Sequence, residues 1–444
     1  MFNIFIFDLP GILDLAENEP AKIDDSNKLS CILWADDLVM FSETEAGLSK
    51  MLSKLSEFAK SNGLIINADK SKCMIFNKMG RHIRCNLPCG DLTIASVREY
   101  KYLGFLVTPS GEVTTGINDL RARASYALVQ LRRKLGDHFR KNVVISMYLF
   151  DSLIKPILLY CSDFWGALKL NKRRPIELIS PTSSHIEVVH MKFLKQLLGV
   201  QKQTSNVGVL LETGRLPLMV YAIKNVIKNW HRISNRKCNS LTYLSYVSII
   251  ENDIDWFGNI SIYVNQIGCG NILWEETQSP ENLVFKRSTD IFYQNSFAEI
   301  TDESSKLRTY SIFKLEAKRE PYLAKVTNIA DRIAFSKFRL SNHKLMIEKG
   351  RHEQLPIDMR KCSFCHCVED ESHFLLDCKI FAHPRRKFLR EAQESIPNNF
   401  DHLSKEMLFK ILLTNEEIAP VLAKYIRIAM EIREFLIENH RQYA

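Results

Sequence analysis

The sequence predicts an α+β fold in which short antiparallel strands come first, a mostly helical region follows, and a small cysteine-rich module lies near the C-terminus. Three observations support this prediction. Two adjacent acids, Asp36 and Asp37, interrupt an apolar run at residues 31–41. Apolar residues recur with helical spacing after residue 115. Four of the 11 cysteines lie within residues 362–378.

The acid pair predicts a β-hairpin with both carboxylates at its tip. A buried carboxylate without a partner is costly, and two adjacent carboxylates repel each other, so the pair must be solvated or bound. One explanation is a tight turn in water. The other is a divalent metal site, because carboxylate oxygens are the ligands that Mg²⁺ prefers.

Residues 43–62 are predicted to form an amphipathic helix that ends at Gly63. Its apolar positions recur at i, i+3, i+4, i+7 and i+10: Leu48, Met51, Leu52, Leu55 and Phe58. A short strand is expected at residues 64–67, and another at residues 99–107, where Gly104 interrupts it.

This order of elements resembles the palm of a reverse transcriptase from a non-LTR retrotransposon of the LINE type. Residues 34–37, Trp-Ala-Asp-Asp, resemble the aromatic-x-Asp-Asp box of that family. Residues 63–72 resemble its Asn/Lys motif, and Tyr102-Leu103-Gly104 resembles its primer-grip strand. The resemblance implies an RNA-directed DNA polymerase, a nucleotidyltransferase that uses Mg²⁺ or Mn²⁺ with an RNA template and a DNA primer.

The resemblance also implies roles for individual residues. Asp36 and Asp37 would be the catalytic acids that bind the metal. Lys70 would lie in the vicinity of the nucleotide, and Tyr102, Leu103 and Gly104 would hold the primer end.

A two-metal polymerase needs a further carboxylate from an upstream strand, and the family has a fingers domain. Neither is visible upstream of the acid pair, so we expect a truncated polymerase that is inactive by itself. The alternative is a non-catalytic remnant that binds nucleic acid, and a third possibility is a fragment that does not fold stably.

The chain has 444 residues and a formal net charge of +9. Residues 115–175 carry twelve Lys or Arg against four Asp or Glu, which suggests contact with a phosphate backbone. A solvated helix face is the alternative that such an excess favours in a generic protein, but the segment lies where the helical thumb of the family follows the palm, and its charge fits that resemblance. Basic residues expected on the first helix of this segment are Arg121, Arg123, Arg132, Arg133 and Lys134. An apolar helix follows at residues 143–160, with a kink at or near Pro156.

Four regions are predicted along the chain: a partial palm at 1–112, a thumb-like basic helical region at 113–175, a mostly helical region at 185–330, and a C-terminal region at 331–444. In the third region, one helix ends at Gly199, a second begins after residues 204–206, and a third begins after Pro217. Core positions are expected for the aromatic residues Tyr243, Tyr246, Trp256, Phe257, Tyr263 and Trp274.

The spacing Cys362-x2-Cys365-x7-His373-x4-Cys378 predicts a structural, tetrahedral zinc site, because thiolates and imidazole are the ligands of such sites. Buried free cysteines are the alternative, and Cys367 could replace Cys365, with His366 as a spare ligand. The arrangement is similar to the cysteine/histidine tail of the same family. Glu371 is expected to be a solvated acid, and a basic face is expected downstream from Arg385, Arg386, Lys387 and Arg390.

No apolar run reaches the roughly 18 residues of a membrane-spanning helix, and no basic segment precedes an apolar core at the N-terminus. An odd number of cysteines argues against a secreted disulfide framework. We therefore expect an intracellular protein, nuclear or cytoplasmic, that is neither secreted nor bound to a membrane.

Overall fold

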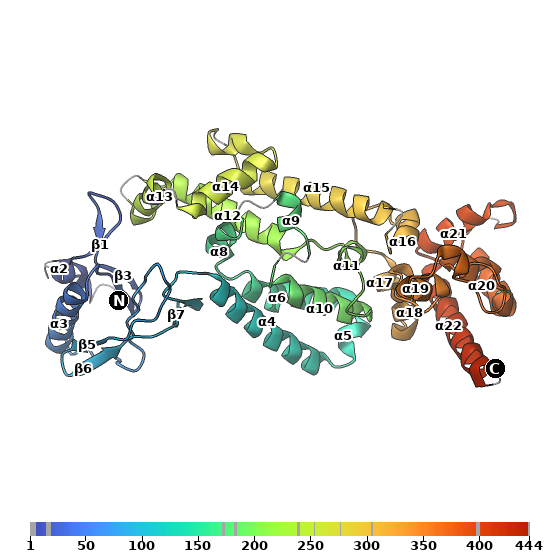
Figure 1. Ribbon diagram of the computed structural model, residues 1–444, viewed down its shortest axis with the longest axis horizontal. Helices are drawn as coiled ribbons and strands as arrows, with labels where there is room; N and C mark the ends of the chain where they lie inside the picture. The colour runs from blue at the N-terminus through green and yellow to red at the C-terminus, as the bar shows by residue number, and fades with distance from the viewer. Residues whose placement is uncertain are drawn as a thin grey trace. The chain divides into compact units, whose positions relative to one another are not determined.

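The computed structural model describes residues 6–14, 19–170, 174–181, 184–237, 240–252, 254–275, 277–302, 305–396 and 400–442 (Figure 1). The chain forms two compact units, each made of separate stretches of sequence. Unit 1 comprises Met1–Leu120, Tyr160–Lys172 and Ile223–Glu281, and unit 2 comprises Arg121–Leu159, Arg173–Ala222 and Asn282–Ala444. Short antiparallel strands precede a largely helical remainder, so the predicted α+β class is confirmed.

The strands of unit 1 pair into antiparallel hairpins, each of which is a separate two-stranded sheet. The pairs are β1 (Ala21–Lys22) with β2 (Lys28–Leu29), β3 (Cys31–Trp34) with β4 (Asp37–Met40), β5 (Asn86–Cys89) with β6 (Leu92–Ala95), and β7 (Tyr100–Tyr102) with β8 (Phe105–Val107).

Helix α3 (Glu45–Ser61) organises the core between these hairpins. Thr44 caps its first turn by accepting a hydrogen bond from the backbone N–H of Gly47 at 3.0 Å. Gly63 follows the helix with a left-handed φ of 67°, as predicted for the residue that ends it. Met51 and Phe58 pack with α2 (Leu9–Asp14) and the β3–β4 hairpin, whereas Leu52 packs against β5 and β6.

Two strand predictions were wrong in detail. Residues 64–67 form no strand, and Ile65 is 95% exposed. The strand expected at residues 99–107 is instead the β7–β8 hairpin. Leu103 and Gly104 both have positive φ, 44° and 85°, which is the backbone of a tight two-residue hairpin turn.

The remaining helices of unit 1 follow the expected helical pattern: α8 (Ser162–Leu168), α13 (Leu241–Glu251), α14 (Asp255–Gln266) and the 3₁₀ turn η1 (Gly270–Leu273). Trp256 and Tyr263 are buried, and the Trp256 indole donates to the carbonyl of Phe164 at 3.2 Å. The core position predicted for Trp274 was wrong, because its side chain is 84% exposed.

Three helices contain residues assigned to both units: α4 (Thr114–Leu135), α12 (Leu218–Ser234) and α15 (Pro280–Thr301). The helices of the first half of unit 2 are α5 (His138–Lys141), α6 (Val143–Leu153), α7 (Lys155–Leu158), α9 (Pro175–Leu178), α10 (Glu187–Leu198) and α11 (Asn206–Thr213). The predicted break near Pro156 is confirmed between α6 and α7. Gly199 ends α10 with a φ of 70°, and Ser205 caps α11, as the sequence predicts.

The second half of unit 2 packs around α22 (Ala419–Gln442), which contacts α17 (Tyr322–Lys325), α18 (Ile329–Arg339), α20 (Ala382–Glu394) and α21 (Lys405–Thr414). The other elements are α16 (Arg308–Phe313), α19 (Met346–His352), the 3₁₀ turns η2 (Ile357–Met359), η4 (Lys379–Phe381) and η5 (Phe400–His402), and the π-helical turn η3 (His373–Asp377). Phe388 of α20 stacks on Tyr425 of α22 with ring centres 4.7 Å apart.

No single helix in the described ranges is long and apolar enough to cross a membrane. The segments Val143–Leu158 and Ser162–Leu168 meet that test only when they are counted together.

Candidate metal centres

The acid pair lies at the tip of the β3–β4 hairpin, as predicted. Trp34 pairs with Asp37, and Ala35 and Asp36 form the two-residue turn. Ala35 has a φ of 55°, a left-handed value that usually favours glycine. Because side chains alternate along a strand, Leu33 and Leu38 pack toward α3, while Trp34 and Asp37 share the exposed face.

Strand β7 brings the other predicted residues of the polymerase motifs close to this tip. The hydroxyl of Tyr100 donates to the backbone carbonyl of Lys70 at 3.2 Å, and the N–H of Lys70 donates to the side chain of Asn67 at 3.0 Å. Burial raises the pKa of Tyr102, and the nearby charge of Asp37 raises it further. The hydrogen bond between Tyr100 and Lys70 thus joins the segment with Lys70 to β7, and Tyr102 lies within electrostatic range of Asp37.

Asp36 and Asp37 are both exposed. In the part of the chain that the structure describes, no third carboxylate, imidazole or thiolate joins them in a group tight enough to hold one ion. The geometry is thus a solvated turn with two exposed carboxylates, which leaves the rest of a metal coordination shell open.

The comparisons with known proteins agree with this arrangement. The family model described as reverse transcriptase (RNA-dependent DNA polymerase) matches residues 1–107. The Pol polyprotein of a type-2 retrotransposable element from Drosophila melanogaster is 34% identical over 94 residues, which are 18% of this chain and 8% of that protein. This chain contains a reverse transcriptase region of the non-LTR retrotransposon kind.

An uncharacterized transposon-derived protein of Caenorhabditis elegans is 26% identical over 174 residues, or 39% of this chain. The chain spans 57% of that relative and 8% of the Drosophila protein. The match to the family model ends at residue 107, where β8 ends and before α4 begins.

The second candidate centre lies in unit 2, outside the reverse transcriptase region. Cys362 and Cys365 lie on a tight loop that is closed by hydrogen bonds from the N–H of Cys362 to the carbonyl of Cys367 and from the N–H of His366 to the carbonyl of Cys362, at 2.8 and 2.9 Å. His373 begins the π-helical turn η3, and Cys378 follows the end of that turn. Each pair of predicted ligands therefore comes from one compact turn.

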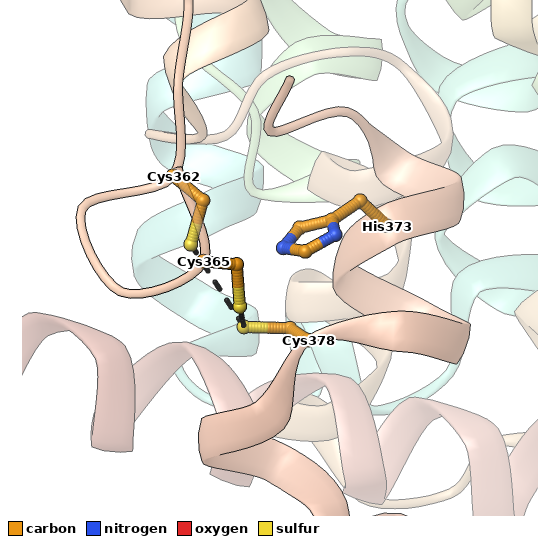
Figure 2. A group of neighbouring side chains, drawn as sticks. All are labelled: Cys362, Cys365, His373 and Cys378. Carbon is orange, nitrogen blue, oxygen red and sulfur yellow. Dashed lines mark hydrogen bonds between the residues drawn. The ribbon is translucent and has the colours of Figure 1, made fainter. Parts of the chain in front are cut away.

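Figure 2 shows the side chains of Cys362, Cys365, His373 and Cys378 turned toward one another. Their ligand atoms all lie within 4.8 Å of each other. The Cys378 sulfur is 3.9 Å from that of Cys362 and 3.8 Å from that of Cys365, and none of these cysteines forms a disulfide. Tetrahedral coordination with Zn–S bonds of about 2.3 Å separates two sulfurs by about 3.8 Å, so the cluster could hold zinc.

The hydrogen bonding of the cluster favours a thiolate. The sulfurs of Cys362 and Cys378 are within hydrogen-bonding distance of each other, and this contact lowers the pKa of the Cys362 thiol. The thiolate is the form that binds a metal.

The two spare ligands lie beside the cluster rather than in it. His366 is exposed and has a left-handed φ of 58°. Cys367 is also exposed, and its sulfur is 3.3 Å from Nδ1 of His373. The described geometry therefore favours Cys365 over Cys367 as the fourth ligand.

The basic residues predicted along the thumb-like helix lie on α4. Arg132, Arg133 and Lys134 form its exposed last turn, whereas Arg121 and Arg123 are half-buried. Arg132 also lies over the ring of Phe139, 5.6 Å from its centre. The exposed cations available to a phosphate backbone are thus concentrated at the C-terminal end of the helix.

Two predictions near the zinc ligands were wrong. Glu371 is 1% exposed and accepts hydrogen bonds from His343 at 3.0 Å and Thr309 at 3.0 Å, so it is a buried anchor rather than a solvated acid. Arg385 is 8% exposed and does not belong to the basic face of Arg386, Lys387 and Arg390.

Sequence reasoning also missed the buried ion pairs of unit 2. Arg339 donates to Glu212 at 2.6 Å and contacts Glu320 at 2.6 Å, and Arg433 forms a bidentate pair with Glu369 at 2.7 and 2.6 Å. The only available signal was the presence of charged residues inside helix-period apolar stretches, which does not identify partners far away in sequence.

Proposed function

We propose that this chain is part of an RNA-directed DNA polymerase of a LINE-type non-LTR retrotransposon. Asp36 and Asp37 would bind Mg²⁺, and Mn²⁺ could substitute. The substrates would be an RNA template and a DNA primer, and the protein would act inside the cell, in the nucleus or cytoplasm. The observation that carries the proposal is the exposed acid pair at the tip of β3–β4, within the segment that matches the reverse transcriptase family.

In this proposal the metal would stabilise the charge that develops during phosphoryl transfer. The two acids would hold it from the hairpin tip. Tyr102, close to Asp37, would lie near the primer end, together with Leu103 and Gly104. A third metal ligand would come from a segment outside the described residues, because none of those residues gathers at the pair.

A second proposal concerns the cysteine cluster. Cys362, Cys365, His373 and Cys378 would bind one structural Zn²⁺, because the sulfur separations already match a tetrahedral site. A closed site with four protein ligands leaves no position for a reacting water, so its role would be to hold the fold of the module.

A non-catalytic function is the alternative. The incomplete ligand set at the acid pair and the exposed cations Arg132, Arg133 and Lys134 favour a protein that binds nucleic acid without extending a primer. The two functions differ in whether a metal binds at the hairpin when a primer–template is present.

Metal-directed cleavage of the protein backbone distinguishes the polymerase function from non-catalytic binding of nucleic acid. Fe²⁺ would replace Mg²⁺ in the full chain bound to an annealed RNA template and DNA primer with a dNTP, and peroxide would then generate radicals at the bound iron. We expect backbone cuts around residues 34–38 and near Tyr102. Asp36→Asn/Asp37→Asn should abolish both cuts.

The matched control is Asp24→Asn/Asp25→Asn. These residues are another adjacent acid pair, in the loop between β1 and β2, where Asp24 accepts hydrogen bonds from the backbone of Ser26 and Asn27. Cleavage should persist in this variant. Cuts that survive loss of Asp36 and Asp37, or no cuts near them in the wild type, would favour the non-catalytic alternative.

A further inference from the structure

Arg385 is a buried cation with no partner acid among the residues that the structure describes. It lies in the first turn of α20, and its side chain is 8% exposed. Its Nη2 donates to the backbone carbonyl of Cys378 at 2.6 Å. Its Nη1 is buried and has no hydrogen-bond acceptor among the described residues, none of which forms a salt bridge with Arg385.

Other buried arginines of unit 2 are better satisfied. Arg339 and Arg433 pair with carboxylates. Arg332 lacks a carboxylate but donates to two backbone carbonyls, those of Val326 and Arg140. A buried charge is strongly unfavourable unless it is paired, so the environment of Arg385 is missing an anion.

The cysteine cluster can provide that anion. A Zn²⁺ ion bound by three thiolates and one neutral imidazole forms a complex with a net charge of minus one. Cys378, whose carbonyl holds Arg385, is one of the proposed ligands. Lys361 and Lys379 adjoin ligands in sequence, but both are exposed and their charges are screened by water.

We propose that Arg385 is the counter-charge of the zinc–thiolate complex and a positioning residue for Cys378. This inference rests on the proposed zinc site. The guanidinium fixes the backbone at Cys378 through its carbonyl, and its positive charge offsets the excess negative charge of the ligands. Such partners outside the ligand set typically change metal affinity by about 10- to 100-fold.

The first experiment measures the zinc affinity of the full chain by competition with a chromophoric chelator. Arg385→Gln should bind zinc roughly 10- to 100-fold more weakly than the wild type. The decrease in zinc affinity should be smaller in Arg385→Lys, because lysine keeps the positive charge. The matched control, Arg386→Gln, removes the same charge from the next residue, which is exposed, and should bind as the wild type does. Wild-type affinity in Arg385→Gln would overturn the inference.

A second measurement separates charge from packing. His373→Cys converts the site to four thiolates with a net charge of minus two, so the loss caused by Arg385→Gln should become larger in that background. A packing role would give the same loss in both backgrounds and would overturn the inference. If Arg385→Gln does not fold, Arg385→Lys is measured instead: its zinc affinity should stay within a few-fold of the wild type because the charge is kept, and a loss of about 10- to 100-fold would count against the charge role.

The same measurements distinguish a failure of the proposed role of Arg385 from a failure of the proposed zinc site. If the wild-type chain binds no zinc, the proposed zinc site is wrong and the inference fails with it. If the wild type binds zinc and Arg385→Gln binds it equally well, only the inference is wrong. The absorption spectrum of the Co²⁺-substituted protein should remain tetrahedral in Arg385→Lys, because the ligands themselves are unchanged.

Discussion

The hydroxyl of Tyr160 donates a hydrogen bond to the backbone carbonyl of Leu103. Leu103 and Gly104 form the turn between β7 and β8, and a Cβ atom at Gly104 would lie 3.3 Å from the Tyr160 hydroxyl oxygen. Tyr160 therefore holds the turn whose residues resemble a primer grip, and a side chain at Gly104 would press against its hydroxyl group.

This contact makes Gly104 sensitive to substitution. Gly104→Ala should destabilise the β7–β8 hairpin by about 1–2 kcal/mol, because alanine is strained at a φ of 85° and its methyl group presses on Tyr160. Hydrogen exchange of residues 100–107 should become faster. Gly111→Ala is the control for backbone strain alone, since Gly111 also has a positive φ, 69°, but has open space around it. Equal acceleration of local exchange in the two variants would show that Tyr160 adds nothing.

The buried pair of Arg339 and Glu212 should contribute strongly to stability. Arg339→Leu leaves the fully buried carboxylate without its cation, and we expect a loss of about 3–5 kcal/mol at neutral pH. Thermal unfolding followed by circular dichroism measures the change. Lys318→Ala, which removes a solvent-exposed pair with Glu316, should have no measurable effect.

The same pair predicts that the stability of the wild type and that of Arg339→Leu depend differently on pH. Burial disfavours the Glu212 carboxylate, but Arg339, together with Lys314 and Tyr322, outweighs burial and lowers the pKa of Glu212 below its ordinary 4.5. The wild type therefore has this stabilisation above about pH 4.5 and loses it as the pH falls further. In Arg339→Leu the contributions of Lys314 and Tyr322 remain but that of Arg339 is lost, so the pKa of Glu212 should lie above its wild-type value. The stability deficit of this variant relative to the wild type should therefore shrink as the pH falls from 7 toward 4.5. Parallel pH profiles would contradict this assignment.

The zinc proposal predicts one zinc per chain by metal analysis of protein purified under reducing conditions. His373→Asn should lose the ion, and His366→Asn should retain it, because His366 is exposed beside the cluster and asparagine tolerates its left-handed φ. Affinity should decrease as the pH falls, since protons compete with zinc for the thiolates. Full zinc retention in Cys378→Ala would refute the ligand set.

The last turn of α4 should bind duplex nucleic acid without sequence preference. Replacing Arg132, Arg133 and Lys134 with glutamine should weaken binding and reduce the log–log salt slope by up to about 2.7, or roughly 0.9 for each phosphate that is no longer neutralised. Lys54, Lys318 and Lys344 changed together to glutamine remove equal charge from exposed pairs elsewhere and serve as the control. An unchanged slope in the α4 variant would mean that this turn does not bind phosphates.

We expect that this chain alone does not extend a primer, because two carboxylates are too few to hold the metals of an in-line displacement. Incubation with a primed RNA template, dNTPs and Mg²⁺ should give no product above background. Robust Mg²⁺-dependent extension that disappears in Asp36→Ala would overturn this expectation and show that the remaining ligand is present.

Local patterns predicted the features that depend on neighbours in sequence. The acid hairpin followed from an apolar run with a polar centre, α3 from its apolar spacing and its glycine, and the cysteine cluster from the intervals between its ligands. The strand expected at residues 64–67 failed because a strand needs a partner edge, which local alternation does not specify.

The environment of buried polar side chains was equally inaccessible to sequence reasoning. The partners of Glu371 lie 28 and 62 residues away, at His343 and Thr309. A charged residue between cysteines resembles a solvated loop until the packing of those distant segments is known. Arg385 was grouped with the exposed cations for the same reason: it stands next to Arg386 and Lys387 in the sequence, and only the packing shows that it is buried while they are exposed.

The burial of the cysteine cluster is uneven. Cys362, His373 and Cys378 are buried, whereas Cys365 is only half-buried. A chelator in solution should therefore reach Cys365 before the three more deeply buried ligands of the cluster. If the cluster holds zinc as proposed, the ion should exchange when the short 362–367 loop opens, without unfolding of the rest of the module.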